Sequence, residues 1–169
     1  MLDGIIDVMG KIAINLFSKK PASDRSCDNC TRCCEGWLTA TIHGEEMYPG
    51  KPCQYVEVDV GCTIYNDRPK NPCKDFMCEW RLNDQIPLEF KPSLSNSIIF
   101  NGTIRGMPYY NIIQCGEEID PEFLSWLVLW CMSANKNVRW EANNKSFWFG
   151  SPEFVYEMQK QDQLENSTV

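Results

Sequence analysis

The stretch "CDNCTRCCEGW", from Cys27 to Trp37, organises the first half of this chain. It carries four cysteines, two of them adjacent, and four more follow downstream. Eight of the ten cysteines therefore fall within residues 27–78, at Cys27, Cys30, Cys33, Cys34, Cys53, Cys62, Cys73 and Cys78. Thiols gathered in this way crosslink the chain, hold a metal or carry out redox chemistry. Which of these roles they have decides how the segment folds.

The cellular compartment separates disulfides from metal ligands, because disulfides persist only under oxidising conditions. The first residues, "MLDGIIDVMGKIAINLFSKKP", make a poor secretory signal. Asp3 and Asp7 stand where such a signal carries positive charge, and Lys11 interrupts the apolar run. We therefore expect an intracellular, cytoplasmic protein, in which clustered cysteines are more often metal ligands than disulfides.

The spacing of the cysteines favours a metal. A C-x2-C turn lets two thiolates converge on one ion, and here two such turns overlap at Cys27, Cys30 and Cys33. An all-cysteine zinc site or a [4Fe–4S] cluster takes four thiolates. Eight thiols thus suffice for two sites, or for one site with four structural or redox cysteines left over. Because thiolate is a soft ligand, zinc or iron–sulfur is favoured over magnesium or calcium.

The adjacent pair Cys33-Cys34 complicates any single site. Neighbouring side chains on an extended chain point to opposite sides, so both rarely bind one ion. We expect them to serve different sites, or one of them to act as a redox or supporting thiol. Outside the cluster, Cys131 is expected to be buried and inert, and a structural role is favoured for Cys115. The only histidine, His43, is favoured as a cap or surface residue over a ligand.

The rest of the chain predicts a single α+β domain over residues 1–169. It comprises an irregular, metal-stapled Cys-rich segment, several helices and a small antiparallel sheet. Its parts are an amphipathic N-terminal helix (1–20), the Cys-rich segment (27–78), strands and helices (97–160) and a polar tail (161–169). Short strands are expected at residues 38–42 and 55–60 of the Cys-rich segment.

Turn and capping residues predict the elements of the second half. Strands within residues 97–114 are expected to be interrupted at Asn101-Gly102 and Gly106. Asp120 predicts the N-cap of an apolar helix that continues to residue 135. A hairpin is expected over residues 138–150 around Asn143-Asn144, and a last helix from Ser151-Pro152 onward.

With its two later motifs, the cysteine pattern resembles a known family. "CDNCTRCC" is followed by "GCTIYNDRP" (61–69) and "CKDFMCEW" (73–80). Residues 27 to 95 resemble the bacterial family named for its CxxCxxCC box and described as zinc- or iron-chelating. The same box occurs in the flagellin lysine N-methylases. The resemblance implies an intracellular metalloprotein from a microbe or phage, with an iron–sulfur cluster favoured and zinc second.

The resemblance also suggests roles for side chains near the thiols. Arg68 could pair with a carboxylate or a thiolate, and structural pairing is favoured over catalysis. Tyr65 and Trp80 could screen the site from water, while Pro69 and Pro72 would fix the loop before Cys73. Ordinary core packing and turn rigidity remain the alternatives for these residues.

Three functions follow, in order of preference. The first is a metal-binding protein that serves electron transfer, sensing or chelation. The second is a component of a protein-modifying, methyltransferase-like enzyme, although the chain lacks a Gly-rich nucleotide loop. The third is an assembly protein or homo-oligomer, which would use the N-terminal helix and exposed tryptophans among Trp126, Trp130, Trp140 and Trp148. A net charge of −7 argues against a nucleic-acid partner, and no apolar run is long enough to span a membrane.

Overall fold

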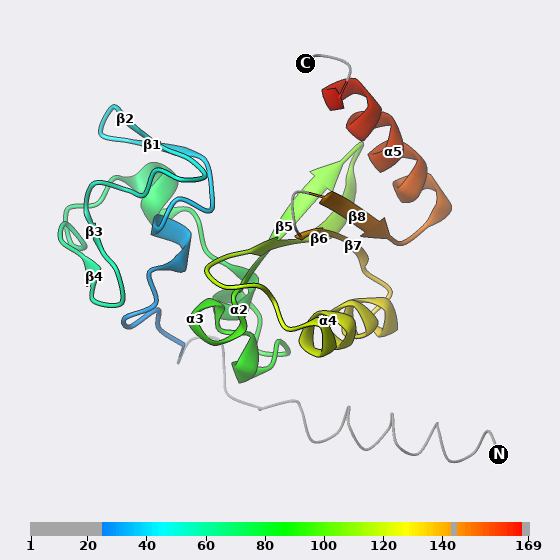
Figure 1. Cartoon of the computed structure of the whole chain (residues 1–169), viewed down its shortest axis with the longest axis horizontal. Coiled ribbons are helices and arrows are strands. Elements are labelled where there is room, and N and C mark those ends of the chain that lie inside the picture. The colour runs from blue at the N-terminus through cyan, green and yellow to red at the C-terminus, as the bar shows by residue number, and fades with distance from the viewer. Residues whose placement is uncertain (1–24, 143–144, 167–169) are drawn as a thin grey trace.

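The chain contains both helices and strands in the computed structural model, which describes residues 25–142 and 145–166. The predicted α+β class is confirmed. The N-terminal helix expected within residues 1–20 lies outside the described residues, and so does the Asn143-Asn144 turn. The Cys-rich segment and the main sheet lie side by side, with the segment at the left of Figure 1.

The Cys-rich segment consists of short elements joined by turns. Two two-stranded antiparallel ladders, β1 with β2 and β3 with β4, lie between two helical turns, η2 and η3. Their bounds are η2 (Arg32–Cys34), β1 (Ala40–Ile42), β2 (Glu45–Met47), β3 (Val56–Glu57), β4 (Gly61–Cys62) and η3 (Lys70–Lys74). Both predicted strands are present but shorter than expected. The second ends early because Asp59 adopts a φ of 58° and turns the chain back.

Three short helical pieces connect this segment to the main sheet. They are α2 (Glu79–Leu82), η4 (Leu88–Phe90) and α3 (Pro92–Ser95). Trp80, Ile86 and Phe90 from this connection are buried in the hydrophobic core of the second half. The connection therefore fixes the end of the Cys-rich segment to the sheet region.

The main sheet has four strands in the order β5-β6-β7-β8. They are β5 (Ser97–Ile104), β6 (Met107–Gln114), β7 (Asn137–Ala142) and β8 (Lys145–Phe149). The expected hairpin of β7 and β8 is confirmed, but the expectation of a purely antiparallel sheet is wrong, because β6 and β7 run parallel. Helix α4 (Pro121–Ser133) connects these two strands, and a helical crossover returns the chain in its original direction.

The predicted break at Asn101-Gly102 is also wrong, because both residues lie inside β5. The predicted break at Gly106 is confirmed, because the turn falls at Arg105 and Gly106, which have φ angles of 49° and 80°. Gly102 pairs with Tyr109 across the ladder, and a Cβ atom at this position would overlap the tyrosine ring. The glycine thus marks a close side-chain approach within a strand.

Two longer helices complete the core. As predicted, Asp120 caps α4, and its Oδ1 accepts hydrogen bonds from the amides of Glu122 (2.7 Å) and Phe123 (3.2 Å). The core contains Leu127 and Cys131 of this helix, both fully buried, as expected for Cys131. The last helix, α5 (Pro152–Asn166), begins where predicted but continues into residues expected to form a tail.

Candidate metal centre

A buried arginine fixes the start of the cysteine cluster. Arg25 lies two residues before Cys27, and its guanidinium donates hydrogen bonds to backbone carbonyls just beyond Cys78. The acceptors are the carbonyls of Trp80, Asn83 (3.0 Å), Asp84 (3.3 Å) and Ile86 (2.6 Å). The guanidinium also lies over the Trp80 ring, 5.1 Å from its centroid. Residues 25–27 and 78–86, far apart in sequence, are thereby held together.

This anchoring brings four thiols around one pocket, and we name them the first cysteine group. The group consists of Cys27, Cys30, Cys33 and Cys78. Apolar residues, including Phe76 and Ile98, line the rest of the pocket together with Arg81. The C-x2-C turn is closed by a 2.7 Å hydrogen bond from the Cys30 amide to the Cys27 carbonyl. Arg81 Nη1 lies 3.7 Å from Cys27 Sγ, within reach of a charge-assisted hydrogen bond to a thiolate.

The thiols of the first group influence one another. Burial, together with the charges of Cys27 and Cys30, raises the pKa of Cys78 to about 11. The pKa of Cys33 is also raised, first by its hydrogen bond with Cys34, then by burial and by nearby thiols. These groups are close enough that several thiolates together repel one another. A cation placed among them would remove that repulsion.

The other four thiols are Cys34 of the adjacent pair and three cysteines among the turns of the Cys-rich segment. This second cysteine group consists of Cys34, Cys53, Cys62 and Cys73. The Cys53 amide donates a 2.9 Å hydrogen bond to the Cys34 carbonyl. Cys62 belongs to β4, whose partner strand β3 starts three residues after Cys53. Cys73 comes from η3, which lies against β1.

The pKa values of Cys53 and Cys73 respond to the charges of other members of the second group. Burial raises the pKa of Cys73, and the charges of Cys34, Cys53 and Cys62 raise it further, opposed by Arg68. The pKa of Cys53 is raised in the same way, by burial and then by the charges of Cys34 and Cys62. Among the described residues, the thiols that raise the pKa values of Cys53 and Cys73 belong to the second group. Those that raise the pKa of Cys78 belong to the first.

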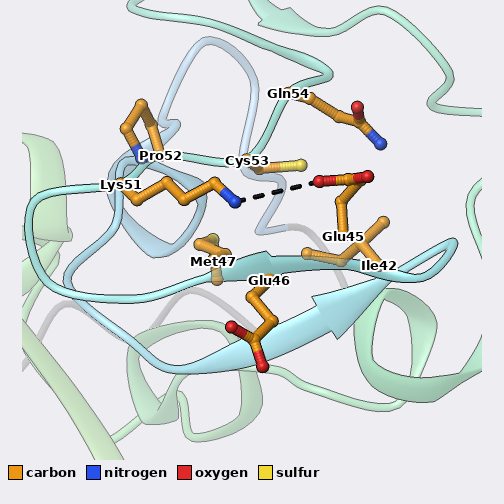
Figure 2. A pocket seen from close by; sticks show the side chains of 8 residues that line it. All are labelled: Ile42, Glu45, Glu46, Met47, Lys51, Pro52, Cys53 and Gln54. Atoms are coloured by element: carbon orange, nitrogen blue, oxygen red, sulfur yellow. Dashed lines mark ion pairs between the residues drawn. The ribbon is translucent and has the colours of Figure 1, made fainter.

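Cys53 also borders a separate small pocket beside the β1–β2 hairpin (Figure 2). Lys51 Nζ and Glu45 Oε2 are 3.8 Å apart there and link the loop before Cys53 to β2. Only one thiol, that of Cys53, lines this pocket. We therefore read it as the place where the hairpin supports the loop, and not as a thiolate site.

Cys33 and Cys34 form the junction of the two groups, with their Sγ atoms 3.8 Å apart. The pKa of Cys34 is lowered, first by the hydrogen bond from Cys33 and then, against burial, by the Arg68 charge. The pair therefore differs in acidity, because the pKa of Cys33 is raised and that of Cys34 is lowered. The charge of Arg68 acts on Cys34, whereas Cys33 lines the pocket with Cys27 and Cys78.

The donors are of the kind that a thiolate-bound metal uses, but the described side chains are not drawn together as in an occupied site. All ten cysteines of the described residues are free. Among residues 25–142 and 145–166, no group of three or more His, Cys, Asp or Glu side chains is arranged so that it could hold a metal ion. Eight soft thiols in two neighbourhoods nevertheless match the four-thiolate requirement of zinc or a cubane cluster.

The remaining two cysteines do not line the pocket of the first group, although Cys115 lies near enough for the charges of Cys30 and Cys78 to raise its pKa. Cys115 and Cys131 are fully buried, and burial raises the pKa of each to about 12. Cys115 Sγ donates to the Pro92 carbonyl at 3.9 Å. Both behave as small apolar core residues, which agrees with the structural role that the sequence favoured.

The other residues singled out from the sequence divide between support and surface. The Arg68 guanidinium lies 3.9 Å from the centroid of the Tyr65 ring, and Tyr65 itself is about half exposed. Trp80 is buried in the core, with its Nε1 donating to the Leu88 carbonyl at 3.1 Å. His43 is exposed at the β1–β2 turn, and its ring packs edge-on against Tyr55.

Sequence reasoning missed the two arginines that accompany the first group. Arg25 stands in the stretch "SKKPASDRS", whose composition indicates a linker. Its role depends on carbonyls more than fifty residues away, and these leave no local signal. Arg81 could have been found, because it follows Cys78 by three residues and thus shares its face at the start of α2.

Comparisons with protein families, curated proteins and solved structures found no match for this chain. In the part of the chain that the structure describes, no helix is long and apolar enough to cross a membrane.

Proposed function

We propose that this protein binds metal through cysteine thiolates, as an iron–sulfur cluster in the first instance and zinc in the second. The observation that carries the proposal is the first cysteine group. Four thiols from the two ends of the Cys-rich segment line one pocket, with Arg81 beside Cys27. Such a set matches the ligand number of both metals.

The residues around the pocket suit a bound thiolate centre. Phe76, Met77 and Ile98 limit the access of water, which strengthens thiolate–metal bonds and tunes a redox potential. Arg81 supplies a positive charge and hydrogen-bond donors to the sulfurs. When bound, an iron–sulfur cluster supplies one-electron transfer, and zinc supplies a structural crosslink. Electron transfer, sensing and chelation are the roles we propose for this protein.

Free thiols in such number also point to a reducing compartment, and we place the protein in the cytoplasm on that ground. This location complements the metal proposal, because reduced cysteines are available as ligands there.

Metal analysis of anaerobically purified protein tests the proposal. We expect stoichiometric iron with a broad visible absorption band, or stoichiometric zinc without one. The variant Cys78→Ser should lose the metal held by the first group, whereas Cys115→Ser should keep it, because Cys115 does not line the pocket of that group. If the unmodified chain contains neither metal in stoichiometric amount, the proposal is wrong.

A further inference from the structure

We propose that the eight cysteines form two separate tetrathiolate sites, one from each cysteine group, which meet at the Cys33–Cys34 peptide bond. The first site takes Cys27, Cys30, Cys33 and Cys78, and the second takes Cys34, Cys53, Cys62 and Cys73. This inference rests on the proposed metal binding and assigns each thiol to a site, which the sequence pattern leaves open.

Chain geometry supports the first assignment. Arg25 holds the segment before Cys27 to the segment after Cys78, so the first and last cysteines of the cluster meet at one pocket. A site built only from the four cysteines of "CDNCTRCC" would leave out Cys78, which lines that pocket, and include Cys34, which does not.

Backbone pairing supports the second assignment. The loop that carries Cys53 is hydrogen-bonded to the Cys34 carbonyl, and the Val56 amide donates in turn to the Cys53 carbonyl at 3.1 Å. Val56 pairs directly with Cys62 across the β3–β4 ladder. Three of the four proposed ligands are therefore joined through a short chain of backbone contacts, and Cys73 comes from η3, which lies against β1 of the same segment.

Each group also has its own arginine. A divalent ion held by four thiolates carries a net charge of about −2, which a nearby cation offsets. Arg81 lies beside Cys27 of the first group, at 3.7 Å from its sulfur. Arg68 belongs to the loop between Cys62 and Cys73 of the second, and its guanidinium lies 3.9 Å from the centroid of the Tyr65 ring. Two separate counter-charges are what two separate anionic centres require.

Paired serine substitutions test the partition, because each variant loses the same number of thiols. In one within-group variant, Cys27→Ser is combined with Cys78→Ser, and in the other Cys53→Ser is combined with Cys73→Ser. The cross-group control combines Cys27→Ser with Cys53→Ser. Each within-group variant should retain about half of the iron or zinc of the unmodified chain, and the cross-group control should retain almost none. A within-group variant that loses all metal, or a cross-group control that keeps half, overturns the partition.

A second measurement uses the unmodified chain, so it does not depend on how the variants fold. Metal is withdrawn stepwise with a chelator, exposed thiols are alkylated with iodoacetamide, and each cysteine is quantified by mass spectrometry. Cys33 should become reactive together with Cys27, and Cys34 together with Cys53. Simultaneous exposure of all eight thiols, or of Cys33 with Cys34 at every step, overturns the partition.

The two proposals fail in different ways. An unmodified chain without stoichiometric metal contradicts the proposed function itself. Stoichiometric metal with another pattern of loss, such as a single site, contradicts only the assignment of cysteines to two sites.

Discussion

At the scale of single residues, Arg25 has a large structural role, although it stands in a stretch whose composition indicates a linker. Its buried guanidinium donates to four backbone carbonyls at and beyond the end of α2, of which that of Asn83 also accepts from the Ile86 amide at 3.2 Å. Charged donors contribute more than neutral ones, and buried carbonyls left without a donor are costly. One side chain thus supplies hydrogen-bond donors that a neighbouring helix or strand would otherwise supply.

We therefore expect Arg25→Ala to lower the free energy of unfolding by about 2–4 kcal/mol, measured by urea denaturation. The control is Arg105→Ala, which removes an exposed arginine paired with Glu157 at 3.5 Å and should cost less than about 1 kcal/mol. Equal effects of the two substitutions would show that the carbonyl contacts of Arg25 add nothing.

The buried thiols Cys115 and Cys131 predict a pH dependence of stability. Burial raises the pKa of each from 9.0 to about 12 in the folded protein. Between these values the unfolded chain releases a proton that the folded chain keeps, so the free energy of unfolding falls as pH rises. Below pH 9.0 the contribution of both thiols is fully present.

The double variant with Cys115→Ala and Cys131→Ala isolates this effect. Its free energy of unfolding should fall less steeply between pH 8 and 10.5 than that of the unmodified chain, as measured by denaturant titration at each pH. Parallel curves for the two proteins would contradict the prediction. Thiols elsewhere in the chain contribute equally to both curves and cancel in the comparison.

At the scale of elements, the β5–β6 hairpin depends on one close approach. Gly102→Ala places a Cβ atom against the far end of the Tyr109 ring, so the ring must shift from its packing against Phe154 of α5. We expect a loss of about 1–3 kcal/mol in stability by thermal or urea denaturation. In a Tyr109→Ala background the same alanine should cost much less, because the ring is gone. Additive costs in this double-mutant cycle would show that the ring is not the cause.

The elements also show what the sequence could predict and what it could not. Local chemistry predicted the Asp120 cap, the start of α5 at Pro152 and the β7–β8 hairpin, because each depends on neighbouring residues. The break predicted at Gly102 was wrong because a glycine in a turn and a glycine beneath a ring look identical in sequence. The parallel pairing of β6 and β7 arises from the path of α4, which no local pattern specifies.

The cysteine cluster divides in the same way. The spacing alone identified all eight thiols as candidate metal ligands. It also raised the question of whether Cys33 and Cys34 serve different sites. It did not place Cys78 beside Cys27, because that contact depends on Arg25 and on the buried connection through Trp80. Long-range hydrogen bonds of this kind have no signature in a single sequence.

At the scale of the whole molecule, the two halves depend on different forces. The sheet and its helices enclose a hydrophobic core that runs from Trp80 to Val138. Between residues 27 and 75 only Ile42 and Met47 are buried apolar side chains, so hydrophobic burial contributes little there. Metal binding would supply the missing stabilisation of this segment, since ligand binding and folding are coupled in small thiolate sites.

This division predicts a local response to metal removal, which amide hydrogen exchange can resolve. After chelation, amides of β1 to β4 should exchange at least about 10-fold faster, whereas those of β5 and β6 should change by less than about 2-fold. The reason is that opening the Cys-rich segment leaves the core around Ile99, Ile112 and Leu127 intact. Equal acceleration in both halves would show that the chain unfolds as one cooperative unit. No acceleration in β1 to β4 would show that the turns and the Arg25 anchor hold the segment without metal.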